Sequence, residues 1–150
     1  MARFRFPMEN ILNMKEKLEE QAKNEYAQAN ARLLREQDKL DAIVRRQEQA
    51  KEKLKQVLSE TLSVMEVREK ENALEIIKMY AMQQLLIVKQ CEKEVEIARA
   101  KLSEAMKERK IFEKLREKAF EEFVREENRK EQKEVDELMS YKYGTKRKNA

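Results

Sequence analysis

Residues 57–67 read VLSETLSVMEV, and this stretch combines a helix start with the centre of a mirrored apolar pattern. Ser63 and Glu66 form a capping box, in which the serine hydroxyl accepts a hydrogen bond from the Glu66 amide and the Glu66 side chain reaches back to the Ser63 amide. Leu62 can pack on Val67 as a hydrophobic staple. The stretch therefore predicts that a helix starts immediately after Ser63.

Working outward from this point, seam residues recur on both sides at alternating spacings of three and four, as a left-handed coiled coil requires. The two residue numbers of every facing pair add up to the same total, which is expected if the chain folds back on itself at residue 62. Large residues often face small ones, which fills a narrow seam, and four pairs contain a Lys, Gln or Glu that can fix the register. The pairs are Val57 with Val67, Leu54 with Lys70, Ala50 with Leu74, Gln47 with Ile77, Ile43 with Ala81, Leu40 with Gln84, Glu36 with Val88, Leu33 with Cys91, Ala29 with Val95 and Tyr26 with Ala98.

The predicted fold is all-α: a two-helix antiparallel coiled-coil hairpin whose C-terminal helix overhangs. We expect one elongated domain over 1–150, with helix one at about 7–60, a turn at about 61–63, helix two at about 64–141 and a basic tail at 142–150. Pro7 suits a first helical position, and Gly144 suits a helix end. About 25 residues of helix two then extend beyond the chain start, or roughly 35 Å.

A rival interpretation is one continuous helix that dimerises, since no Gly or Pro enforces the turn. Folding by the same rule also places Leu18 opposite Met106. In both predicted helices the apolar residues near this pair are spaced by four: Leu18, Ala22 and Tyr26 in the first, and Ala98, Leu102 and Met106 in the second.

Composition favours long helices, because 43% of the residues are charged and the chain has one Gly, one Pro and no Trp. The 34 basic and 30 acidic residues are interleaved, giving a net charge of +4. Interleaving is typical of solvated helix faces rather than of a nucleic-acid stripe, so no nucleic-acid partner is predicted. The basic run 146–148 is interpreted as a disordered, solubilising end.

No apolar stretch approaches the roughly 20 residues that a membrane helix needs, so we expect a cytosolic protein without direct membrane insertion. The lone Cys91 fits a reducing compartment. Its seam position predicts a small buried hydrophobe rather than a reactive thiol.

The residues that most enzymes and cofactor sites need are missing. There is no His, and Gly144 is the single glycine, so glycine-rich phosphate loops and His-based metal or catalytic sites cannot be built. Acidic residues sit one helical turn from lysines and arginines, and two helices provide no cleft. We therefore predict no enzyme activity and no catalytic, cofactor-binding or metal-binding residue.

Aromatic residues are concentrated at the open end of the predicted hairpin, far from the turn. Phe4 and Phe6 fold next to Phe120 and Phe123 by the hairpin rule. They can cap the open end of the seam, as aromatic stripes usually do, or form a docking surface for another protein. Both roles are compatible with the pattern.

Two stretches resemble the FliJ family of flagellar export proteins. One is Phe4-x-Phe6 followed by Ile11, Leu12 and Lys15, and the other comprises residues 112–116 and 127–138. The resemblance implies an antiparallel hairpin like the central stalk of rotary ATPases. It also implies contact with a hexameric flagellar export ATPase, with an export gate membrane protein and with export chaperones, so that ATP hydrolysis is coupled to export. The protein would be cytoplasmic and peripherally associated with the inner face of the cell membrane.

The resemblance further implies which residues bind these partners. The gate contact falls near Ile43, Ile77 and Tyr80, where this chain has Arg46, Ala50 and Ala73 in place of the aromatics common in relatives. The residues expected to contact the ATPase ring lie at the chain ends: Phe4, Phe6, Phe120, Phe123, Asn128, Arg129, Gln132, Lys133, Asp136 and Leu138.

Two other functions remain open at this point. One is a stalk subunit of a different secretion system or rotary ATPase, with the same rod and a different ring. The other is a homodimeric coiled-coil scaffold.

Overall fold

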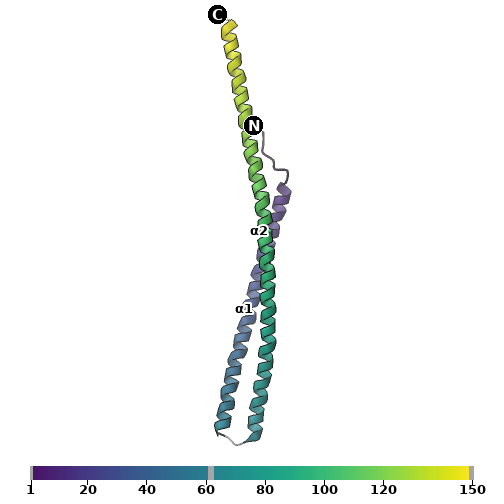
Figure 1. Ribbon diagram of the computed structural model, residues 1–150, viewed down its shortest axis with the longest axis vertical. Helices are drawn as coiled ribbons and strands as arrows, with labels where there is room; N and C mark the ends of the chain where they lie inside the picture. Colours follow the sequence, from purple (N-terminus) through teal and green to yellow (C-terminus); the bar gives the residue numbers. More distant parts are fainter. Residues whose placement is uncertain (1, 61–62, 149–150) are drawn as a thin grey trace. The chain divides into compact units, whose positions relative to one another are not determined.

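The computed structural model describes the backbone of residues 2–60 and 63–148, and the side chains of these residues as far as 145. It contains two helices, α1 (Glu9–Glu60) and α2 (Val64–Lys148), and no strand within the described ranges (Figure 1). The predicted all-α hairpin is confirmed.

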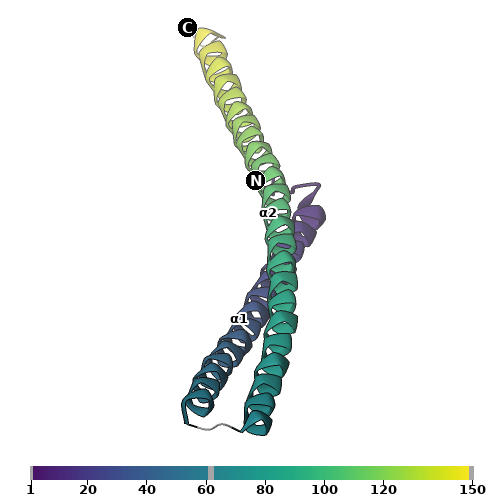
Figure 2. The same ribbon diagram turned by 60° about the horizontal axis from the view of Figure 1, so that its bottom comes forward.

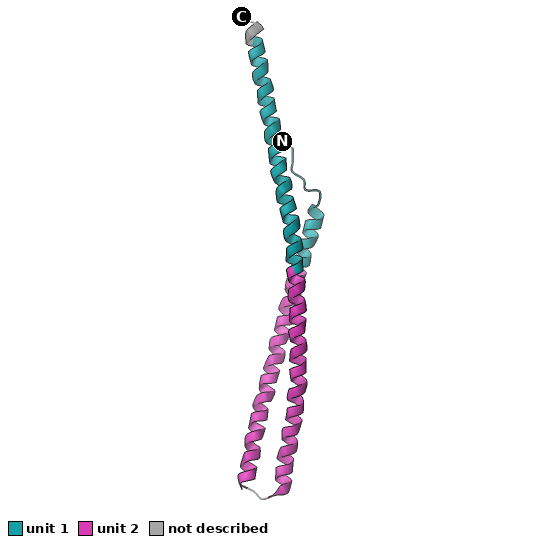
Figure 3. Ribbon diagram, viewed as in Figure 1, with its two compact units in different colours: residues 1–19, 104–150 teal, residues 20–103 magenta. Residues whose placement is uncertain are grey.

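The chain divides into two compact units, each built from parts of both helices (Figure 3). We call Glu20–Ser103 the central unit, and Met1–Glu19 together with Glu104–Ala150 the terminal unit. In the central unit α1 and α2 run antiparallel and side by side, as both Figure 1 and the turned view of Figure 2 show.

The seam of the central unit is the predicted one. Every predicted seam position is buried or half-buried, whereas most residues between them are exposed. On α2 the burial is deepest, with Val88 4% exposed, Val95 5% and Cys91 1%. The free Cys91 thiol is thus a buried seam residue, as predicted. Because only two helices meet, water reaches both sides of the seam, and most of the α1 residues stay half-buried.

The start of α2 follows part of the predicted capping box. The Glu66 amide donates to Ser63 Oγ at 3.5 Å, and the Val67 amide donates to the Ser63 carbonyl at 3.3 Å. The first bond satisfies an amide that has no main-chain partner in the first helical turn, and the second is the first main-chain bond of α2. Leu62 of the predicted staple, and residues 61–62 of the predicted turn, lie outside the described residues.

The start of α1 is shifted slightly from the predicted one. Pro7 and Met8 form a turn, and α1 begins at Glu9. The Glu9 amide donates to the Phe6 carbonyl at 3.1 Å, and the Leu12 amide donates to the Met8 carbonyl at 3.0 Å. The turn at Pro7 and Met8 therefore takes the place of the first two predicted helical residues.

The end of α2 lies further along the chain than expected. The helix passes Tyr141, where the sequence predicted its end, and continues through Gly144 to Lys148. Gly144 does not have positive φ, so it is a helix-interior residue rather than a C-cap. An interior glycine costs about 1 kcal/mol relative to alanine, which is small enough for good helix formers nearby to offset.

Candidate partner-binding surfaces

Three aromatic rings meet in the terminal unit, and we call Phe4, Phe120 and Phe123 the aromatic clasp. Phe4 packs edge-on against Phe120, with ring centroids 5.2 Å apart and planes at 78°, and its centroid is 5.5 Å from that of Phe123. Phe120 and Phe123 lie one turn apart on α2 with centroids at 6.5 Å. The clasp holds the non-helical N-terminal segment against α2, because edge-on ring pairs add specific attraction to apolar burial.

Charged contacts surround the clasp. The Arg116 guanidinium lies 5.9 Å from the Phe4 ring centroid, and its Nε donates to Glu9 Oε2 at 2.9 Å. Phe6 is 8% exposed, whereas Phe120 keeps 48% of its surface in solvent. The four aromatics predicted for the chain ends therefore all lie in this unit. They serve packing, and Phe120 also offers an accessible ring.

A partly buried ion pair joins α1 and α2 in the terminal unit, next to the predicted apolar layer. Glu19 is 5% exposed and accepts a hydrogen bond from Arg109 Nε, while Leu18 is 43% exposed. The expected seam position of Leu18 is therefore wrong, and its neighbour occupies the interface. Arg109 also donates to Glu113 Oε2 at 2.7 Å, and this bond, followed by the one to Glu19, raises the pKa of Arg109.

Sequence reasoning missed this pair, although a signal was present. The apolar spacing steps by four around Leu18, which rotates the stripe by about 40° per step, since each residue turns the helix by about 100°. Such a rotation brings an adjacent position to the interface. Lys15 marks the next contact, with its Nζ 2.8 Å from Glu108 Oε2 and 5.9 Å from the Phe112 ring centroid.

Beyond the clasp, α2 continues as a helix whose side chains are exposed at every position from 128 to 145; we call 128–145 the uncovered segment. Gln132 Nε2 donates to Asp136 Oδ1 at 3.2 Å within it. Arg129 pairs with Glu126 at 3.3 Å. Leu138 lies on a different face of the helix from the polar residues predicted for ring binding. Those polar residues recur at spacings of three and four and share one face: Asn128, Arg129, Gln132, Lys133 and Asp136.

The residues expected to contact a gate protein lie together in the central unit. Ile43, Ile77 and Tyr80 line one groove of about 440 Å³. Tyr80 is 58% exposed, and the two isoleucines are half-buried seam residues. The groove continues along the other wall residues Arg46, Gln83, Gln84 and Ile87. A neighbouring groove of about 230 Å³ is lined by several residues that include Arg46, Ala50 and Ala73.

An exposed apolar run on α2 borders this groove and was not singled out from the sequence. Between Ile76 and Val88 the only charged residue is Lys78, in a chain that is 43% charged. Much of the run faces solvent, at 53% to 70% exposure for Ile76, Met79, Met82 and Leu86. The missing charge was the signal that could have revealed it.

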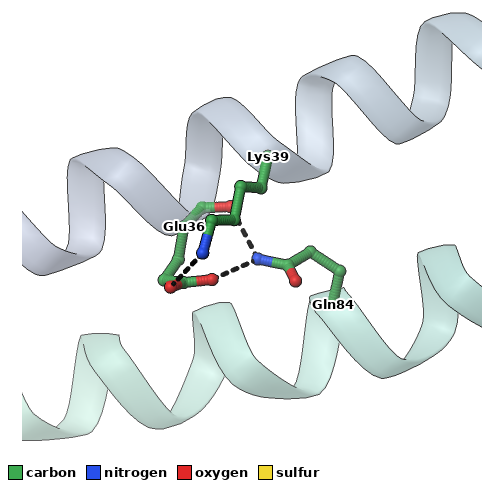
Figure 4. Close-up of polar contacts among 3 residues, drawn as sticks. All are labelled: Glu36, Lys39 and Gln84. Atoms are coloured by element: carbon green, nitrogen blue, oxygen red, sulfur yellow. Dashed lines mark hydrogen bonds and ion pairs between the residues drawn. The ribbon is translucent and has the colours of Figure 1, made fainter.

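A polar layer interrupts the seam near the groove (Figure 4). Gln84 Nε2 donates to Glu36 Oε2 at 2.6 Å and to the Glu36 carbonyl at 2.9 Å, and Lys39 Nζ donates to Glu36 Oε1 at 3.1 Å. The hydrogen bond from Gln84, and then that from Lys39, lowers the pKa of Glu36. Because the layer pairs one α1 residue with one α2 residue, it favours a single register.

A second polar contact between the helices lies further along the central unit. Arg99 donates to Tyr26 Oη at 3.3 Å, and its guanidinium lies 5.9 Å from the Tyr26 ring centroid. Hydrogen bonds with Asn30 and then with Arg99 lower the pKa of Tyr26. Arg32 and Glu94 form an ion pair at 2.7 Å nearby.

Neither a metal-binding cluster nor a membrane-spanning helix is found where the structure is described. Within residues 2–60 and 63–148, no group of three or more Cys, Asp or Glu side chains is arranged to hold a metal ion. No helix in the same ranges is both long and apolar enough to cross a bilayer.

The fold and these surfaces define a class: a coiled-coil hairpin with exposed grooves and an uncovered helix end. Residues 4–148 match the family described as "Flagellar FliJ protein", and the chain belongs to this family. The family consists of non-catalytic components of flagellar type III protein export, so this chain is a non-enzymatic export component.

Comparison with solved structures supports the fold. A protein from Chlamydia trachomatis described as a YscO homologue superposes with a TM-score of 0.59 at 20% identity, covering 99% of this chain and 100% of the other. Among curated proteins, none matches the sequence.

Proposed function

We propose that this chain is the stalk-like factor of the flagellar export apparatus, which binds the hexameric export ATPase through its chain ends and couples ATP hydrolysis to export. The observation that carries the proposal is the uncovered segment, in which every described side chain is exposed. A narrow helix without an intramolecular partner fits the bore of a ring better than it fits free solution, where an uncovered helix of this length is marginal.

The residues that would contact the ring are the aromatic clasp with Phe6, and the polar face of the uncovered segment. Phe120 supplies an apolar anchor that is still 48% exposed. The polar face, Asn128 to Asp136, presents both signs of charge. A rim of mixed charges favours orientation and specificity over raw affinity.

The export gate protein would bind the central unit at the groove of Ile43, Ile77 and Tyr80. The adjoining run from Ile76 to Val88 supports this site, because an exposed apolar patch on a highly charged chain is unusual. Export chaperones are further candidate partners of the same chain. The protein would then work at the cytoplasmic face of the membrane.

The central test measures ATP turnover and ring assembly of the cognate export ATPase with and without the purified chain. We expect stimulation by the wild type, and loss of stimulation by the R129A/Q132A/K133A variant. The matched control R45A/Q49A/K53A removes the same residue types from exposed positions of α1 and should stimulate normally. If the wild type leaves turnover and assembly unchanged, and deletion of residues 123–138 leaves cells motile, the proposal is wrong.

A separate test addresses the gate. Y80A should weaken capture of the gate protein while leaving ATPase stimulation intact. The control L34A removes a similarly exposed apolar side chain outside the groove and should leave capture of the gate protein unchanged. Equal capture by wild type and Y80A would contradict the gate site alone.

Two alternatives have distinct outcomes in the same experiments. A stalk of another secretion system or rotary ATPase would stimulate that system's ring and not the flagellar one. A homodimeric scaffold would sediment at twice the chain mass. The intramolecular seam of the central unit argues against the dimer, because its apolar positions are already covered by the chain itself.

A further inference from the structure

The end of α2 combines an apolar stripe with positive charge, and neither property is used by the contacts described above. Val135, Leu138, Met139 and Lys142 follow one another at spacings that place them on one face of the helix. The three apolar side chains are 52%, 62% and 53% exposed. Within residues 135–142 the two acidic residues, Asp136 and Glu137, lie on other faces. Glu131 and Glu134 lie one turn before Val135 and Leu138, so the acid-free part of the stripe begins at Val135.

The charge balance changes sharply at this point of the chain. Residues 138–150 contain Lys142, Lys146, Arg147 and Lys148 and no Asp or Glu, although the chain as a whole has nearly as many acids as bases. Tyr141 and Tyr143 lie between the apolar stripe and the basic run, and they are 74% and 69% exposed. Tyrosine prefers the boundary between water and an apolar phase, because its ring is apolar and its hydroxyl is polar.

We propose that residues 135–148 form an interfacial helix that binds the surface of an anionic lipid membrane. An apolar stripe inserts between lipid headgroups, tyrosines lie at the boundary, and lysines and arginines meet the negative surface potential. The helix lies on the bilayer and does not cross it, in agreement with the lack of a spanning helix in the described ranges.

The chemistry of the stripe decides between possible anionic partners. A nucleic acid would use the positive charges but would leave Val135, Leu138 and Met139 without a role, since phosphate contacts carry the affinity there. Every side chain from 135 to 145 is exposed, so this part of the helix offers no groove into which an acidic peptide could fit. A bilayer surface uses the apolar, aromatic and basic groups together.

A membrane contact of residues 135–148 requires neither the ATPase nor the gate. Residues 135–145 also belong to the uncovered segment that the proposed function places in a ring, so one helix would make the two contacts at different times. The membrane contact nevertheless suits a component of protein export, which takes place at a membrane. Leu138 belongs to both proposed sets of contacts, so the decisive variants leave it unchanged.

The test is co-sedimentation of the full chain with vesicles of phosphatidylcholine alone or mixed with phosphatidylglycerol. We expect binding to the mixed vesicles to be stronger by roughly tenfold or more and to weaken as salt is added. The variant K142Q/K146Q/R147Q/K148Q should lose this preference. The matched control R45Q/K53Q/K55Q/R68Q removes the same net charge from exposed positions elsewhere and should keep it.

The apolar contribution is tested with V135S/M139S, which should weaken binding to mixed vesicles several-fold while circular dichroism of the free protein stays unchanged. Equal binding to both vesicle types, or equal loss in the two charge variants, would overturn the proposal. It would also be overturned if duplex DNA competed fully for the basic residues while the V135S/M139S variant bound vesicles as well as the wild type. ATPase stimulation, measured in parallel, reports separately on the proposed function.

Discussion

Gln84 of α2 hydrogen-bonds both the side chain and the main-chain carbonyl of Glu36 on α1, at 2.6 Å and 2.9 Å. The sequence pairs Gln84 with Leu40 and Glu36 with Val88, so the bonds join two adjacent layers of the seam. A long amide side chain can span one helical turn in this way. The contact fixes where the two helices stand along each other, which apolar layers of similar size do only weakly.

Replacing Gln84 by alanine should destabilise the hairpin, because Glu36 would lose its shortest hydrogen bond and a nearly buried side chain would be removed. We expect a thermal midpoint lower by roughly 4 °C or more, measured by circular dichroism. Q83A removes the exposed neighbouring glutamine and should change the midpoint by far less. Equal shifts in both variants would show that the hydrogen bonds contribute nothing.

The same layer makes stability depend on pH. The pKa of Glu36 is lowered in the folded state from its ordinary value of 4.5, chiefly by Gln84 and then by Lys39. A lowered pKa stabilises the folded protein above the ordinary value, and this contribution is lost as the pH falls through the folded pKa. The difference in unfolding free energy between wild type and E36Q should therefore shrink below about pH 4.5.

Urea unfolding at a series of pH values measures that difference. The control is the same comparison in the Q84A background, where the main cause of the shift is absent and the pH dependence should be weaker. A difference that stays constant down to pH 3 or so would rule out the carboxylate of Glu36 as its source.

The register itself can be tested by a disulfide. With Cys91 replaced by alanine, A50C and L74C should form a bond within one chain on mild oxidation, because the predicted register pairs the two positions and both are covered in the central unit. The pair A50C and M79C is the control, since Met79 is 61% exposed and points away from the seam. Bonds between chains in place of bonds within them would favour the dimer.

The fold could be predicted because a hairpin seam repeats one simple rule along its length. Most layers place apolar residues at two positions whose numbers share a fixed total, and Cys91, which the rule pairs with Leu33, is buried as expected. The contact between Phe4 and Phe120 follows the same total, far from the turn. A wrong assignment at one layer therefore does not change the predicted register, because the other layers agree on it.

The remaining features depend on information that periodicity does not hold. Whether Leu18 or Glu19 faces the partner is decided by a rotation of the stripe and by Arg109 on the other helix. The run from Ile76 to Val88 is apolar on several sides of α2. The contact with α1 covers some of these sides, and the others are exposed to solvent. The spacing of apolar residues does not identify the protein that would bind such a surface.

Glu19 is buried at the interface and Leu18 is exposed, which is the opposite of what the apolar pattern predicts. Replacing Glu19 should therefore disturb the terminal unit more than replacing Leu18. E19A should reduce the hydrogen-exchange protection of residues 9–19 by roughly tenfold or more, because it leaves the half-buried Arg109 guanidinium without its partner across the helices. L18A should change protection by less than about threefold, since Leu18 is 43% exposed. The double variant E19L/R109L should recover much of the loss. If L18A reduced protection more than E19A, Leu18 and not Glu19 would be the residue that packs in the seam.

Gly144 offers a test of where α2 ends. As a C-cap it would need positive φ, and alanine would be strained there; as an interior residue it should be improved by alanine. The structure places it inside the helix, without positive φ and with nothing within 4 Å of an added Cβ. G144A should therefore favour the helix by about 1 kcal/mol locally. Carbon chemical shifts of residues 141–146 would become more helical, whereas shifts that move toward coil would mean that α2 ends before Gly144, as the sequence alone suggested.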